Sequence, residues 1–167
     1  MADYYANFSF IIQLPNPEAR KAALALADAA INYDGEVPHT LPASLVEAVE
    51  DWRFEVEATD ECGLWLHSGD GGLDAVCVFI QHLLQAFNPE GHLGFEWSHD
   101  CSRPRTDAYG GGAAFITASG IKSMNTHDWL MEQTAKASTT RVANWRHTTN
   151  ENNEPITTRT YSASQTS

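Results

Sequence analysis

The chain has 167 residues, 43% of them hydrophobic, which predicts one globular domain with a buried core rather than a disordered chain. Its formal net charge of −12 argues against direct binding to nucleic acid or to an anionic membrane, because both require a basic footprint. The charge is uneven, since residues 1–100 hold 17 acids and three bases whereas residues 101–167 hold five acids and seven bases.

The cysteines and the N-terminal sequence indicate the compartment. Cys62, Cys77 and Cys101 are odd in number and lack a CxxC spacing, which favours a reducing environment over a disulfide scaffold. The opening sequence MADYYANFSF lacks the basic start and the small-residue cleavage site of a signal peptide. No apolar run reaches the length of a membrane span. We therefore expect a cytoplasmic protein that does not associate with membranes.

The first half of the chain predicts two helices and three strands. Residues 8–14 (FSFIIQL) are β-rich and apolar at their centre, which is typical of a central strand. An Asn-Pro-Glu start predicts a helix over residues 16–33, and a shorter helix is expected over residues 43–51. Apolar and polar side chains alternate over residues 54–59, which predicts a half-exposed strand with an acidic outer face, paired with residues 64–67.

The second half predicts the strongest helix of the chain. Apolar residues recur at steps of three and four over residues 73–87, as in an amphipathic helix. Strands are expected over residues 93–98 and 113–118, as antiparallel partners on either side of a polar loop. A last short helix is expected over residues 127–136.

The order of these elements predicts the fold class. Strand, helix, strand, strand, helix and strand match the α+β, ferredoxin-like split βαβ arrangement (βαββαβ), with an extra antiparallel strand and a closing C-terminal helix. We expect this domain to occupy residues 5–136. Residues 137–167 are rich in Ser, Thr and Asn, which predicts a flexible tail.

The acidic segment from Glu47 to Glu61 gives the strongest charge signal, because its acids face a single base, Arg53. A solvated face is the ordinary explanation of such a run. The sharper interpretation is a negative surface that docks on a basic partner, in the way that phosphates would occupy a nucleic-acid groove. On this interpretation the binding residues are Glu47, Glu50, Asp51, Glu55 and Glu57.

The polar loop after residue 98 carries the densest mixture of acid, base and thiol groups: His99, Asp100, Cys101, Arg103 and Arg105. These residues could bind a metal or supply acid–base chemistry, with the arginines holding an anion and His67 contributing from a neighbouring element. However, adjacent residues of a strand point to opposite faces, and no second His/Cys cluster completes a four-coordinate site. We therefore favour structure or partner recognition for this loop, and expect no catalytic residues, no metal ligands and no cofactor.

The loop ends on three consecutive glycines, which allow either close approach of a ligand or tight packing where the next strand begins. Packing is the favoured interpretation. In the binding interpretation the loop contributes Arg103, Arg105, Tyr109, Gly110, Gly111 and Gly112.

Two stretches, GLWLHSGDGGLDAVCVFIQHLLQAFNP and FEWSHDCSRPRTDAYGGGAAFIT, resemble a family of small uncharacterised proteins from phages, plasmids and bacterial mobile elements. The shared pattern is an aromatic strand followed by CSxPRxDxYGGGA. The resemblance covers roughly residues 5–135 and implies a mobile-element setting, without implying an activity or a catalytic residue.

The sequence thus predicts a non-enzymatic, acidic protein that docks on a host or partner protein with a basic surface, in an inhibitory or accessory role. Two alternatives stay open at this point. One is a small hydrolase or metal-binding enzyme that uses His99, Asp100 and Cys101, and the other is a structural or virion component. A symmetric homo-oligomer formed through the sheet edge would favour the structural or virion component.

Overall fold

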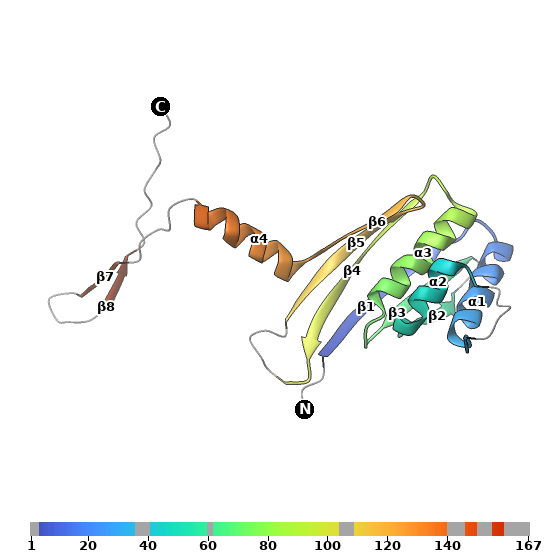
Figure 1. Ribbon diagram of the computed structural model, residues 1–167, viewed down its shortest axis with the longest axis horizontal. Coiled ribbons are helices and arrows are strands. Elements are labelled where there is room, and N and C mark those ends of the chain that lie inside the picture. Colours follow the sequence, from blue (N-terminus) through green and yellow to red (C-terminus); the bar gives the residue numbers. More distant parts are fainter. Residues whose placement is uncertain are drawn as a thin grey trace. The chain divides into compact units, whose positions relative to one another are not determined.

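The computed structural model describes residues 4–35, 41–59, 62–103, 109–139, 146–149 and 155–158 (Figure 1). The chain forms two compact units, residues 1–127 and residues 128–167. The first unit holds an antiparallel sheet of six strands, in the order β2-β3-β1-β4-β5-β6. These strands are β1 (Tyr4–Gln13), β2 (Glu55–Ala58), β3 (Gly63–Ser68), β4 (His92–Cys101), β5 (Gly110–Thr117) and β6 (Gly120–Asn125).

The first strand joins the two halves of this sheet. Its first part, residues 4–7, pairs with β4, and its second part, residues 8–13, pairs with β3. The sequence FSFIIQ supplies β-branched and aromatic side chains for both neighbours, which is why this stretch occupies a central position. Phe10 stacks on Phe95 of β4 with ring centroids 4.6 Å apart, which ties the two halves together through the core.

Three helices and one 3-10 turn form the second layer: α1 (Pro17–Ile31), α2 (Ala43–Ala48), η1 (Val49–Asp51) and α3 (Leu73–Phe87). As the sequence predicts, Asn16 caps α1, since its side-chain oxygen accepts a hydrogen bond from the Ala19 N–H at 2.8 Å. Four alanines of α1 are buried, and their small size allows the helix to lie close to the sheet. The periodicity of α3 is confirmed with the predicted bounds, and its apolar stripe is buried.

Helices α1, α2 and α3 lie on the same side of the sheet (Figure 1). The strand residues that point toward them form one core with the helices, and they include Phe8, Ile12, Leu64, Leu66, Phe95, Ala114 and Ile116. The strand residues of opposite parity point away from the helices. Among the described residues of this unit no helix covers that second face of the sheet. We call it the uncovered face.

The predicted ferredoxin-like fold class is wrong. The structure is a six-stranded antiparallel sheet with helices rather than a simple split βαβ unit with one added strand. The strand that the sequence missed is β6, whose residues GIKSMN are exposed or half-buried along their whole length. An edge strand of this kind buries too little surface to impose an alternating pattern on its sequence. The coarser α+β class is confirmed.

The second unit holds most of α4 (Thr126–Thr139) and a two-stranded antiparallel hairpin, β7 (Arg146–Thr149) and β8 (Pro155–Thr158). Within α4, Lys136 and Glu132 form an ion pair at 2.6 Å, one helical turn apart. The division into a domain of residues 5–136 and a flexible tail stays a prediction. None of the helices in the described part of the chain has both the length and the apolar character needed to span a bilayer.

Candidate functional site

The acidic segment is divided between the two layers. Glu47 and Glu50 are exposed on α2 and η1, in the helix layer, and Asp51 of η1 pairs with Arg53 at 3.3 Å. Glu55 and Glu57 are exposed on β2 and point to the uncovered face. The sequence predicts that these five acids form one surface, whereas the fold places them in two separate sets. The strand alternation of residues 54–59 correctly predicted the outward direction of Glu55 and Glu57.

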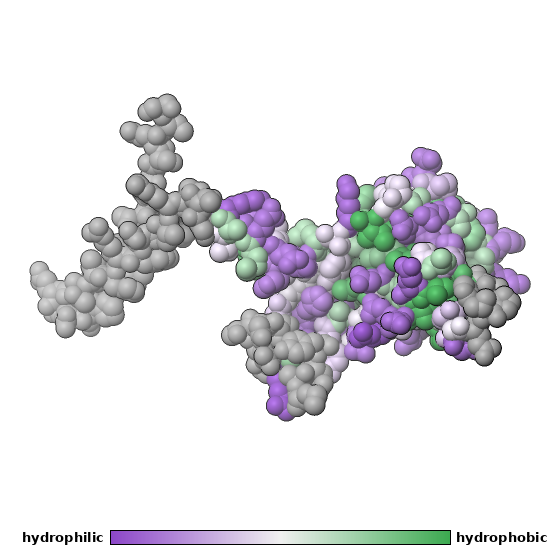
Figure 2. Space-filling model, in the orientation of Figure 1, coloured by the Kyte–Doolittle hydropathy of each residue, from purple (hydrophilic) through white to green (hydrophobic). Residues whose placement is uncertain are grey.

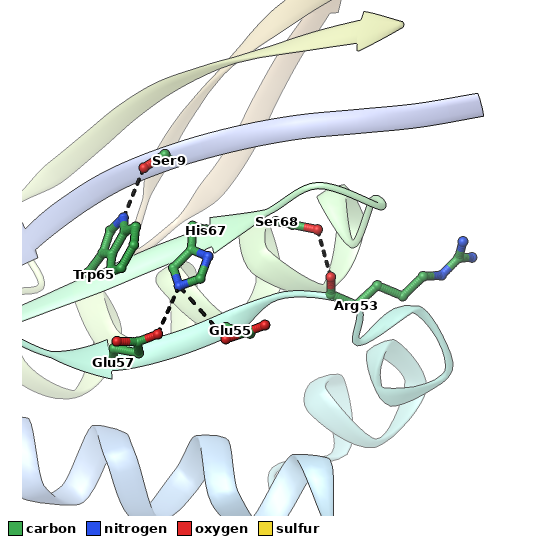
Figure 3. A network of polar contacts seen from close by, with 7 residues as sticks. All are labelled: Ser9, Arg53, Glu55, Glu57, Trp65, His67 and Ser68. Atoms are coloured by element: carbon green, nitrogen blue, oxygen red, sulfur yellow. Dashed lines mark hydrogen bonds and ion pairs between the residues drawn. The ribbon is translucent and has the colours of Figure 1, made fainter. Parts of the chain in front are cut away.

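Glu55 and Glu57 meet His67 of the neighbouring strand (Figure 3). Glu55 lies opposite His67 in the β2–β3 register, and Glu57 follows two residues later on the same face. The Nε2 atom of His67 lies 3.2 Å from Oε1 of Glu57 and 4.0 Å from Oε2 of Glu55. The sequence did not predict this cluster, because it depends on which residues of β2 and β3 lie opposite each other.

The imidazole of His67 is held by an aromatic contact. It stacks on the Trp65 ring with centroids 3.8 Å apart and an interplanar angle of 28°. The Trp65 indole in turn donates a hydrogen bond from Nε1 to Oγ of Ser9, on the adjacent β1, at 2.9 Å. Side chains from β1, β2 and β3 therefore form one connected arrangement on the uncovered face (Figure 3).

The predicted loop of residues 98–112 is shorter than expected, because β4 continues to Cys101. Strand alternation then separates its reactive groups: His99 and Cys101 share one face of β4, and Asp100 is exposed on the other. His99 Nε2 accepts a hydrogen bond from the Trp97 indole at 3.1 Å. In this arrangement the three side chains do not converge on one point. Arg103 is exposed, and Arg105 lies outside the described residues.

The three glycines open β5, and two of them lie where a side chain has no room. A Cβ on Gly111 would overlap the carbonyl oxygen of Trp97, and one on Gly112 would overlap the carbonyl oxygen of Met124 and the Trp97 ring. The N–H of Gly111 donates to Oγ1 of Thr126 at 3.1 Å. These contacts are what close packing of β5 between β4 and β6 requires. Tyr109, just before the strand, is 64% exposed.

The uncovered face combines acidic and apolar side chains. Its exposed charged residues, as far as the chain is described, are the acids Glu55, Glu57, Glu96 and Asp100 and the base Lys122. Its exposed apolar residues are Ile11, Phe115 and Met124, which are 56%, 47% and 51% exposed. Figure 2 shows the molecule in the orientation of Figure 1, where hydrophilic and hydrophobic residues are interspersed over the helix layer.

Two shallow hollows mark the uncovered face. The first, of about 590 Å³, lies over β4, β5 and β6 and is lined in part by Gly94, Ala113, Phe115 and Met124. The second, of about 660 Å³, lies over β1, β3 and β4 and is lined in part by Trp65, His67 and Glu96. Because small residues lie beside large exposed side chains, this face has concave regions that a flat sheet of polar residues would lack.

Two titratable groups with shifted pKa values lie in the helix layer, on α3: Cys77, which is buried, and His82, which is half-buried. Burial, followed by the negative charge of Asp74, raises the pKa of the Cys77 thiol to about 12. Burial also lowers the pKa of His82 below its ordinary value. Cys77 is thus a core residue without thiolate character at neutral pH, as its place on the apolar helix face indicates.

The fold and this face define a class: a two-layer α+β protein in which one sheet face, among the described residues of the first unit, carries no helix and is lined by acids and apolar side chains. Comparison of the chain with protein-family models, with curated proteins and with solved structures gives no match. The resemblance to mobile-element proteins therefore stays a prediction based on the residues that suggest it.

Proposed function

We propose that this protein is a non-enzymatic binding protein whose uncovered face docks a basic segment of a partner protein. The observation that carries the proposal is the composition of that face. Three large apolar side chains are about half exposed there, beside four exposed acids and one exposed lysine. Exposed apolar groups that gather on one face and are rimmed by charge are typical of protein interaction sites.

Charge complementarity indicates the chemistry of the partner. A face with four acids and one base attracts a partner segment that carries lysine or arginine, and apolar side chains of that segment would fill the hollow beside Phe115 and Met124. A second copy of this chain presents the same negative face, so face-to-face self-association brings like charges together and is disfavoured.

The density of charge argues against mimicry of nucleic acid. Six strands span roughly 24 Å at about 4.8 Å per strand, and B-DNA of that length carries roughly 14 phosphates at one per 1.7 Å of axis. The uncovered face offers four acids among its described residues. The partner is therefore one that combines ionic and apolar contacts, rather than one built to grip a phosphate backbone. An inhibitory or accessory role in a mobile element is the setting that the resemblance favours.

The experiment compares two double substitutions with the same change in net charge. Glu57→Lys/Glu96→Lys reverses two acids of the uncovered face, and Glu47→Lys/Glu50→Lys reverses two exposed acids of the helix layer. A partner captured by the tagged wild-type chain is purified and titrated against each variant at low and at high salt. Each exposed pair is worth about 0.2–1 kcal/mol, and reversal adds repulsion of similar size, so the two substitutions at the uncovered face are expected to weaken binding by at least about fourfold.

The helix-layer variant is the matched control, and it should bind as the wild type does. Binding that survives reversal of the uncovered face but is lost in the helix-layer variant would contradict the proposal and move the interface to the helices. Binding that neither variant changes, and that added salt does not weaken, would remove charge complementarity as the basis of recognition.

A further inference from the structure

The cluster of Glu55, Glu57 and His67 is suited to more than an ion pair. One oxygen from each carboxylate and one nitrogen of the imidazole all lie within 4.8 Å of one another. Across the described residues these are the three side chains that bring metal-binding atoms together in this way. They come from two adjacent strands, so backbone hydrogen bonds of the sheet fix the spacing of their Cα atoms.

The imidazole is already oriented toward the two carboxylates. Its side chain is 22% exposed and stacks on Trp65, which the hydrogen bond to Ser9 holds in place. The Nε2 atom is the ring nitrogen that faces both Glu55 and Glu57 (Figure 3). A fixed ring orientation favours metal binding, because a freely rotating ring would lose rotational entropy when the metal binds.

The distances fit a small divalent ion after modest side-chain rotation. With metal–nitrogen and metal–oxygen bonds of about 2.0–2.1 Å, ligand atoms of a tetrahedral site lie about 3.3 Å apart. The separation of His67 and Glu57 is 3.2 Å, and that of His67 and Glu55 is 4.0 Å. The carboxylates are 53% and 74% exposed, so their terminal torsions can close the remaining gap without disturbing the core.

The donor set selects the class of ion. One neutral imidazole and two carboxylates supply mixed nitrogen and oxygen ligands with two negative charges, which suits a borderline divalent metal better than Ca²⁺ or Mg²⁺. The geometry points to a surface site for a zinc-class divalent transition metal, held by Glu55, Glu57 and His67, with water in the remaining coordination positions. The ion would neutralise two of the acids on the uncovered face.

Calorimetric titration of the chelator-treated full chain with Zn²⁺ tests the site without any partner. The wild type is expected to bind Zn²⁺ saturably, and His67→Gln or the pair Glu55→Gln/Glu57→Gln is expected to weaken binding by at least about tenfold. Two further variants, His92→Gln and Glu47→Gln, remove the same residue types at exposed positions outside the cluster, and they should bind Zn²⁺ as the wild type does. Circular dichroism confirms that each variant is folded.

A second readout locates the ion. Co²⁺ bound beside the stacked imidazole should quench the emission of Trp65, so part of the tryptophan fluorescence falls on titration. Trp65→Phe keeps an aromatic ring against His67 and should retain Zn²⁺ binding while it loses the quenching. An isotherm for His67→Gln that overlays the wild type would place any binding elsewhere on the chain. If the wild type shows no saturable Zn²⁺ binding, the three side chains form an ion pair and not a metal site. Either of these two results would overturn the proposed site.

Discussion

The substitution Gly112→Ala tests how tightly the sheet is packed, because it adds a single methyl group where β5 contacts its neighbours. An added Cβ at this position would lie 2.8 Å from Cε2 of Trp97 and would overlap the carbonyl oxygen of Met124 on β6. The oxygen belongs to the backbone and the ring is half-buried, so neither can move away freely. Overpacking of this kind costs typically about 1–3 kcal/mol of unfolding free energy.

Gly120 is the matched control for Gly112→Ala. It starts β6 in the same half of the sheet, but a Cβ there would meet nothing within 4 Å. Gly120→Ala is therefore expected to change the unfolding free energy by less than about 0.5 kcal/mol. The two substitutions have the same chemistry and differ in the space around the new methyl group.

Urea denaturation followed by tryptophan emission measures both effects. With a slope of about 1–3 kcal/mol per molar urea, Gly112→Ala should lower the midpoint by roughly 1 M, whereas Gly120→Ala should leave it almost unchanged. Equal midpoints for the two variants would refute the reasoning, since they would show that β5 has room at Gly112. The glycines would then be available for the approach of a ligand to the backbone.

Two further predictions concern Cys77 and His82 of α3, which are buried and half-buried respectively. A thiol reagent at neutral pH should modify Cys62 and Cys101 in the folded chain but spare Cys77, whose pKa burial raises to about 12, and fast labelling of Cys77 detected by mass spectrometry would contradict its burial. Because the folded-state pKa of His82 lies below its unfolded value of about 6.5, the unfolded chain binds more protons as the pH falls through that value. Thermal stability should therefore decline on acidification, and less so in His82→Gln; an unchanged pH profile in that variant would exclude His82 as a source of the decline.

Helices and strands were predictable where one buried face imposes a regular spacing of apolar residues on the sequence. The helix of residues 73–87 has an apolar stripe against the sheet, and its bounds were found. The Asn16 cap likewise depends only on adjacent residues. By contrast β6 has no buried stripe, and the sequence shows no sign of it. The fold class was wrong for this reason, since local patterns do not determine how far a sheet extends.

The candidate site was predictable only in part. Alternation along β2 predicted that Glu55 and Glu57 point outward, but their meeting with His67 depends on cross-strand register. The same limit affected the acidic segment, in which Glu47 is close to Glu55 in sequence and yet lies in the other layer. Strand alternation separates His99 and Asp100, as expected for adjacent residues of a strand.

Site-specific photo-crosslinking in the native host tests the uncovered face as the binding surface most directly. A photoreactive phenylalanine analogue replaces Phe115, which is 47% exposed on that face, or Ile31, which is 59% exposed at the end of α1 in the helix layer. The account predicts a discrete adduct with a lysine- or arginine-rich protein segment from position 115 and none from position 31. A discrete adduct from position 31 alone would contradict it.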